Sequence, residues 1–129
     1  MRRRKLLIAD DSEMNRAILA NVLDQEFEVI EATNGQEVII ALQSYGTQIS
    51  ALLLDIVMPE MDGFEVLEEM NRRHWIEDIP TIMISAETSN TYIDRAFELG
   101  ASDYISRPFV PGIVRRRIIN TILLHTKKH

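Results

Sequence analysis

The feature that most constrains the fold of this chain is a fivefold alternation of short apolar runs with helix-like segments. Strand-like runs cover residues 6–10, 27–32, 52–55, 81–85 and 103–105. Segments with helical spacing follow at about 12–25, 36–43, 64–73, 89–99 and 112–125. Such alternation predicts a parallel sheet with helices on both faces, and the right-handed crossover rule leaves few topologies. We therefore expect an α/β fold, a flavodoxin-like three-layer sandwich whose five-stranded parallel sheet has the order 2-1-3-4-5.

The spacing of apolar residues supports the helix assignments. In the first helix the residues at helical spacing are Met14, Ala17, Ile18, Val22 and Leu23. In the last helix the apolar side consists of Ile118, Ile119, Ile122 and Leu123. Both sets recur at three- and four-residue intervals, as expected for a helix with one side against a core.

Length and composition favour a single domain over residues 1–129. A chain of 129 residues with 46% hydrophobic content can fill one core. No run of 18 apolar residues is present, so no membrane span is expected. The basic residues 1–5 resemble the start of a signal peptide, but the apolar stretch 6–9 behind them is too short. With no cysteine, disulfides and thiolate metal sites are excluded, and we expect a cytoplasmic protein.

Charge is distributed unevenly along the chain. The net charge is −6, yet residues 1–5 hold four of the 14 basic residues and residues 115–128 hold five more. The span 6–114 therefore has five basic and 20 acidic residues, a balance of −15. Such an acidic body disfavours direct binding of nucleic acid and suits a cation or a basic partner. An ordinary solvated surface is the alternative explanation for most of these charges.

Acidic residues stand where two of the expected strands end. Asp55 closes the apolar run 51–54, and Asp10 and Asp11 follow the run 6–9. In the expected topology these strands flank the switch point, so three carboxylates would meet at one edge of the sheet. Like charges gather only where a cation, a proton or a phosphoryl group compensates them. The alternative for Asp10 and Asp11 is capping of the helix that follows.

Four separated motifs carry a resemblance to a known family. They are Asp10-Asp11 after the first strand, Asp55 followed by the loop 58–63, Ser85-Ala86 after the fourth strand, and residues 104–109 around the fifth strand. In this order, and over essentially the whole chain, they make the sequence similar to the response-regulator receiver domains of two-component signalling.

The resemblance implies a phosphorylation-dependent signalling switch rather than an enzyme. Asp55 would be the phosphoacceptor, taking a phosphoryl group from a phosphohistidine of a sensor histidine kinase or a phosphotransfer protein. The cofactor would be Mg²⁺, with Mn²⁺ as a second candidate, since hard cations prefer oxygen ligands. The implied ligands are Asp11, Asp55, the backbone carbonyl of Val57, and Asp10 either directly or through water.

Two further residues match the family's switch positions. The hydroxyl of Ser85 would bond a phosphoryl oxygen, and the ring of Tyr104 would move between an outer and an inner position. A capping hydroxyl and an ordinary half-buried strand aromatic are the respective alternatives. Ala86 leaves room for an inward ring.

The main departure from the family is Arg107, where lysine is usual. Arginine keeps the positive charge but is planar and bulkier, so the two are not interchangeable. Arg107 either replaces lysine with altered phosphorylation, or points outward and leaves a disabled switch, or marks a pseudoreceiver that accepts no phosphate. The resemblance also implies a cis peptide bond before Pro108.

The expected partner surface comprises the helix 89–99, the fifth strand and the last helix. It would contact an output domain or a second copy of the chain, and the basic triplet 115–117 lies within it. The last helix either leads into an output domain in a longer chain or ends a single-domain regulator. No direct nucleic-acid or membrane contact is expected.

Three other functional classes are alternatives to the phosphorylated signalling switch. A magnesium-dependent phosphatase of the haloacid-dehalogenase type needs a second Asp two residues after the nucleophile, where this chain has Val57. A nucleotide or flavin module needs a glycine-rich loop after the first strand, where Asp10 and Asp11 stand instead. A phosphorylation-independent protein–protein module remains the main alternative, because Arg107 replaces the usual lysine.

Overall fold

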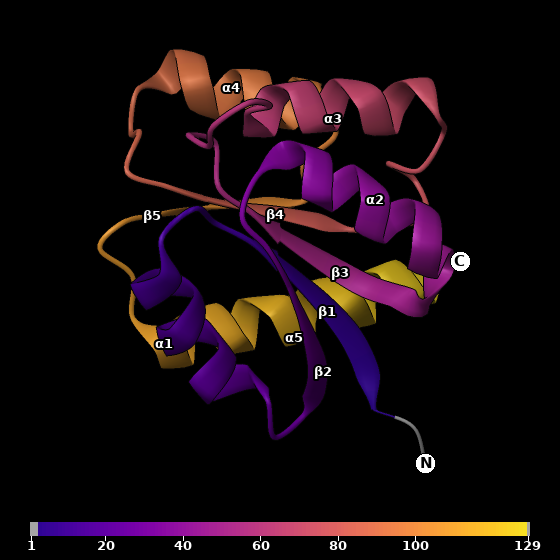
Figure 1. Cartoon of the computed structure of the whole chain (residues 1–129), viewed down its shortest axis with the longest axis vertical. Helices are drawn as coiled ribbons and strands as arrows, with labels where there is room; N and C mark the ends of the chain where they lie inside the picture. The colour runs from indigo at the N-terminus through magenta and orange to yellow at the C-terminus, as the bar shows by residue number, and fades with distance from the viewer. Residues whose placement is uncertain (1–2, 129) are drawn as a thin grey trace.

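Five parallel strands form one sheet in the order β2-β1-β3-β4-β5, as expected (Figure 1). The structure, a computed structural model, describes residues 3–128, so the outermost residues of the expected domain 1–129 lie outside it. The strands are β1 Arg4–Ala9, β2 Phe27–Ala32, β3 Ile49–Leu54, β4 Thr81–Ser85 and β5 Asp103–Ser106. The helices are α1 Glu13–Leu23, α2 Gly35–Tyr45, a short 3₁₀ turn Gly46–Gln48, α3 Gly63–Arg72, α4 Asn90–Glu98 and α5 Pro111–Lys128.

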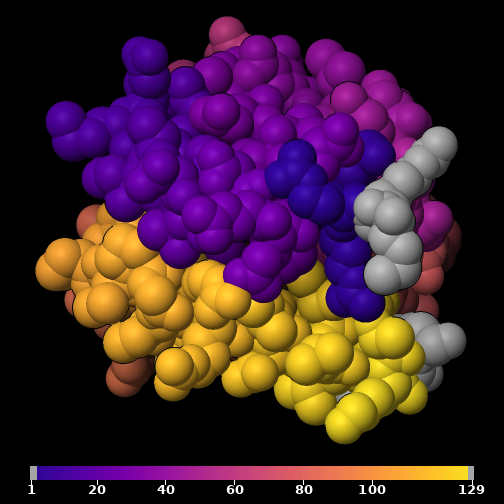
Figure 2. Space-filling view, turned by 90° about the horizontal axis from the view of Figure 1, so that it is seen from below, coloured from indigo at the N-terminus to yellow at the C-terminus, as the bar shows by residue number. Residues whose placement is uncertain are grey.

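The helices cover both faces of the sheet. In Figure 1, α2, α3 and α4 lie above the sheet, whereas α1 and α5 lie below it. Alternate residues of β1 point to opposite faces, so Leu7 joins the core under α2–α4 and Leu6 joins the core over α1 and α5. Burying one such leucine contributes about 1.5–3 kcal/mol. Figure 2 shows the lower face from outside, with α5 beside the N-terminal third of the chain.

The predicted bounds of two elements were wrong. The third strand begins at Ile49 rather than at residue 52, and the last helix runs over Pro111–Lys128 rather than 112–125. The buried residues of α1 are Leu19 and Leu23, while Met14 and Ile18 are exposed. In α5, Ile118 and Ile122 are buried but Leu123 is exposed. Spacing alone does not fix the rotation of a helix about its axis, since the surface that it meets decides which stripe is covered.

Among residues 3–128, no helix combines the length and the apolar character that crossing a bilayer requires.

Candidate functional site

Asp55 is the first residue after β3 and lies at the carboxyl edge of the sheet. Its backbone N–H donates to the carbonyl of Ala9 at the end of β1, 3.0 Å away. The following loop folds back tightly, because the N–H of Gly63 donates to the carbonyl of Ile56 at 2.8 Å. A Cβ at Gly63 would lie 2.4 Å from the carbonyl oxygen of Asp55, so this approach requires glycine. The Asp55 carboxylate is therefore held on a tight turn, and the residue is only 4% exposed.

Asp10 and Asp11 follow β1 at the same edge. The Oδ1 of Asp10 accepts from the N–H of Ser12 at 2.9 Å, and its carbonyl accepts from Arg16 at 2.7 Å. Asp10 is 2% exposed, whereas Asp11 is exposed. Carboxylate oxygens of Asp10, Asp11 and Asp55, which we call the acid cluster, all lie within 4.8 Å of one another. The predicted convergence of three carboxylates is confirmed.

Arg107 reaches into the acid cluster from the end of β5. One terminal nitrogen of its guanidinium donates to Oδ2 of Asp55 at 3.2 Å, and the other donates to Oδ2 of Asp10. Its Nε is buried and has no hydrogen-bond partner in the described part of the chain, residues 3–128. The outward orientation, one of three alternatives for this arginine, is not the one in the structure. The bond before Pro108 is cis, as the resemblance implied.

Burial sets the electrostatics of the acceptor. Desolvation raises the pKa of Asp55 from 3.8 to about 6. The nearby charge of Arg107 opposes this rise in pKa, and the carboxylate of Asp10 adds to it. At neutral pH the Asp55 carboxylate is thus mainly ionised but poorly compensated, so added positive charge at this edge is favourable.

Ser85 and Tyr104 both engage the loop between β4 and α4. The fully buried Ser85 hydroxyl accepts from the N–H of Glu87 at 3.1 Å. The Tyr104 ring belongs to the core under α2–α4, and its hydroxyl donates to the Glu87 carbonyl at 2.7 Å. Burial raises the pKa of Tyr104. Of the two expected ring positions the structure has the inner one, and the polar groups of this loop are linked to the strand ends beside Asp55.

The donor set of the acid cluster suits a hard divalent cation. It consists of carboxylate oxygens alone, and Asp11 is accessible from solvent. Neither imidazole nor thiolate, the ligands that favour softer metals, belongs to the acid cluster. Mg²⁺ binds through one or two carboxylates plus phosphate and water, so these residues fit Mg²⁺ or Mn²⁺. The side chain of Val57 is 62% exposed, and the role of its carbonyl as a ligand stays a prediction.

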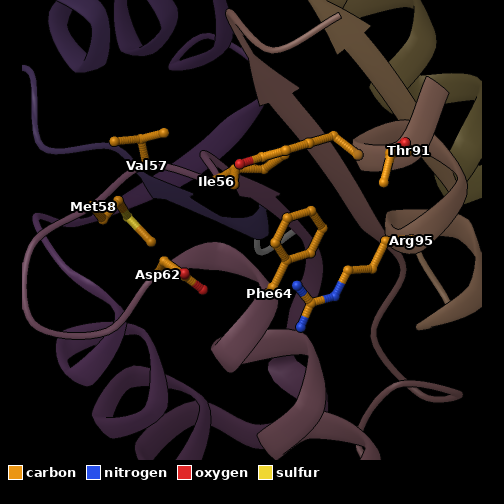
Figure 3. A pocket seen from close by; sticks show the side chains of 8 residues that line it. Ile56, Val57, Met58, Asp62, Phe64, Thr91 and Arg95 are labelled. Atoms are coloured by element: carbon orange, nitrogen blue, oxygen red, sulfur yellow. The ribbon is translucent and has the colours of Figure 1, made fainter. Parts of the chain in front are cut away.

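A cavity of about 360 Å³ lies between the loop after β3 and α4. Figure 3 shows Met58 and Asp62 of the loop on one side, Thr91 and Arg95 of α4 on the other, and Phe64 between them. The Arg95 guanidinium lies over the Phe64 ring, 4.5 Å from its centroid. No member of the acid cluster lines this cavity, but Ile56 and Val57, which follow Asp55 in the chain, do, so it adjoins the carboxylate site.

Two features that shape the site were not predicted from the sequence: the contacts of Arg16 and the capping box at the start of α3. Arg16 holds the backbone of Asp10 and pairs with Glu31 at 3.0 Å, and no local pattern signals either contact. The start of α3 behind the acceptor loop could have been read from the sequence. Asp62 and Glu65 form a capping box there, and an Asp followed three residues later by Glu is its signature.

Comparison with known proteins places the chain in one family. The model of the response regulator receiver domain matches residues 6–119. Response regulator RR06 of Streptococcus pneumoniae is 40% identical over 114 residues, which cover 88% of this chain and 50% of that protein. The transcriptional regulatory protein SrrA of Staphylococcus aureus is 39% identical over 88% of this chain and 46% of its own length. The chain thus spans about half the length of these curated relatives.

Solved structures agree on the fold. A CheY-like receiver domain protein from Methanospirillum hungatei superimposes with a TM-score of 0.90 at 22% identity, covering 99% of this chain and 100% of that chain. Chemotaxis protein CheY4 of Vibrio cholerae superimposes with a TM-score of 0.84 at 26% identity, covering 93% of this chain and 99% of its own. The chain therefore belongs to the response regulator receiver domain family of two-component systems.

Proposed function

We propose that this domain is a phosphorylation-dependent switch whose phosphoacceptor is Asp55. The observation that supports it most is the convergence of the acid cluster with Arg107 on a buried strand end. A phosphoryl group brings negative charge into this edge, so it needs both a cation and positioned donors. The acid cluster offers ligands for Mg²⁺ or Mn²⁺, and Arg107 and Ser85 offer donors.

The proposed reaction is transfer between two nucleophiles. An oxygen of the Asp55 carboxylate attacks the phosphorus of a phosphohistidine on a sensor kinase or phosphotransfer protein. The P–N bond breaks as the new P–O bond forms, and the leaving imidazole takes up a proton from solvent. A bound Mg²⁺ supplies neutralisation of charge on the phosphoryl oxygens. Asp55 is consumed as acceptor, so the domain turns over only through loss of its own phosphoryl group and is no enzyme for a separate substrate.

We propose that the β4–α4 loop carries the change outward. Ser85, which accepts from the Glu87 N–H, would turn its hydroxyl proton toward a phosphoryl oxygen. Tyr104, bonded to the Glu87 carbonyl, would then be held in its inner position. The readout surface would be α4, β5 and α5, meeting an output domain or a second copy. On α5, Arg115 pairs with Glu26 and Arg117 pairs with Asp103 at 3.6 Å, whereas Arg116 is exposed. A phosphorylation signal passes only if the partner binds one conformer better.

The test is incubation of the chain with Mg²⁺ and acetyl phosphate, followed by intact mass measurement. We expect the mass of one phosphoryl group to be added to the wild type and none to Asp55→Asn. Asp94→Asn is the matched control, because Asp94 is an exposed aspartate on α4. Trp75 fluorescence is a poor readout, since Trp75 lies in the α3–β4 connection at the opposite edge of the sheet.

A wild type that gains no mass with magnesium and a competent donor would refute the proposal. That outcome would favour the phosphorylation-independent module, in which Arg107 closes the site permanently.

A further inference from the structure

Arg107 already occupies the part of the site that a divalent cation needs. Its guanidinium bonds Oδ2 of both Asp10 and Asp55, the two buried members of the acid cluster. The other oxygen of Asp10 accepts from the Ser12 N–H at 2.9 Å. Both oxygens of Asp10 are therefore engaged, and Asp11 alone stands in solvent.

We propose that Arg107 is a built-in counter-cation that competes with the divalent ion for Asp10 and Asp55, and so sets how much metal the switch requires. The proposal rests on the metal site of the proposed function and concerns the regulation of that site. A divalent cation and the guanidinium carry like charge and bind the same two carboxylates, so each lowers the affinity of the site for the other.

The chemistry of arginine makes the competition stronger than lysine would. Arginine stays charged at every physiological pH, so it cannot leave the pair by losing a proton. Its planar fork holds two carboxylates at once, whereas a lysine ammonium is a compact point charge on a flexible stem. Mg²⁺ requires nearly ideal octahedral geometry with short bonds to oxygen. The guanidinium lies against Oδ2 of both carboxylates, so an approaching Mg²⁺ meets crowding and the repulsion of a like charge.

The structure also leaves space into which the Arg107 side chain can move. Its Nε has no partner among residues 3–128, so the two carboxylates, rather than a surrounding frame, orient the guanidinium. A cavity of about 650 Å³ opens beside it, lined among others by Asn15, Ile18 and Phe109. A displaced side chain can turn into this space without disturbing the core. Binding of the metal and release of Arg107 from the two carboxylates are then one event, and the released guanidinium is free to donate to a phosphoryl group at Asp55.

The test measures affinity for Mg²⁺ by isothermal titration calorimetry in four proteins. They are the wild type, Arg107→Met, Arg107→Lys and the control Arg95→Met. Arg95 pairs with Glu68 at 3.4 Å on the α3–α4 surface, so its loss changes the net charge equally without touching the acid cluster. Circular dichroism confirms that each variant is folded.

We expect Arg107→Met to bind Mg²⁺ about tenfold more tightly than the wild type, within the usual range of coupling between two sites. Arg107→Lys should fall between them, and Arg95→Met should match the wild type. A second readout is the Nε–H resonance of Arg107, which should shift on saturation of the wild type with Mg²⁺. Arg107→Met binding no more tightly than Arg95→Met, or an unmoved Nε–H resonance at saturation, would overturn the inference.

Acetyl phosphate labelling separates this inference from the proposed function. A wild type that is phosphorylated on Asp55 while Arg107→Met shows unchanged metal affinity would refute only the competition. A wild type that binds Mg²⁺ more weakly than Arg107→Met yet is never phosphorylated would support the competition and refute the switch.

Discussion

The two edges of the sheet are made by the same five strands, yet they differ in the kind of polar group that they bury. At the carboxyl edge Asp10, Asp55 and Ser85 are buried, and Arg107 lies over the two aspartates. At the amino edge Lys5, whose side chain is 18% exposed, pairs with the half-exposed Glu28 at 2.9 Å, so this pair stays partly in contact with solvent.

The difference between the two edges indicates which polar groups serve function and which have little effect on stability. Surface pairs such as Lys5–Glu28 contribute little to stability and cost little to keep. Buried like charges are expensive, and one arginine does not neutralise three carboxylates. The acid cluster therefore lowers the stability of the folded state, as is common for residues that serve binding or chemistry. Each prediction below tests the contrast between the two edges.

The largest effect is expected at the turn that holds the acceptor. Gly63→Ala should destabilise the protein by about 3 kcal/mol, because the new Cβ would press on the backbone oxygen of Asp55. Urea denaturation measures the change in free energy of unfolding. Gly112→Ala is the control, since nothing lies within 4 Å of its Cβ position, and it should leave stability within about 1 kcal/mol. Equal effects of the two substitutions would mean that the turn tolerates displacement.

Removing the solvent-exposed member of the acid cluster should weaken metal binding. Asp11→Asn is expected to lower the affinity for Mg²⁺ by about 10–100-fold, the loss typical of disturbed metal sites, with little effect on folding. Titration calorimetry gives the affinity. Glu28→Gln at the amino edge removes the same charge and should leave the affinity unchanged. A matching loss in Glu28→Gln would attribute the effect to net charge alone.

The ionised carboxylate of Asp55 should lower the stability of the metal-free protein. Because burial raises the pKa of Asp55 from 3.8 to about 6, the folded state binds more protons than the unfolded state between these values. Stability from this group therefore falls as the pH rises from about 4 to 6, and the penalty is complete above about 6.

Asp55→Asn removes that penalty. It should stabilise the protein at pH 7 by about 1–2 kcal/mol, after discounting for Arg107 and for screening at the rim of the site. Near pH 4 the two proteins should be equally stable. Urea denaturation in EDTA at both pH values tests this, and a less stable Asp55→Asn at pH 7 would contradict it.

The smallest effect is expected from the amino-edge ion pair. Lys5→Met should change the free energy of unfolding by no more than about 0.5 kcal/mol, because its partner Glu28 is half exposed. A loss of several kcal/mol, measured by the same denaturation, would remove the distinction between the two edges.

Much of this molecule was predictable from local pattern. The apolar runs before Asp10 and Asp55 predicted strands buried on both faces, and the crossover rule then placed these acids at one edge. The contacts of Arg16 and the close approach of Gly63 to Asp55 were not predictable, because each joins segments that no sequence period connects. The rotation of α1 was not predictable either, since the neighbouring surface decides which stripe of a helix is covered.

The order of strands and helices and the meeting of three carboxylates are consequences of the sequence alone, because hydrophobic periodicity and chain handedness act locally and allow few alternatives. The direction of Arg107 was left open by the sequence, since a long flexible side chain takes its orientation from charges contributed by β1 and β3. Only the tertiary structure brings those charges to the end of β5, and there the arginine meets the acceptor.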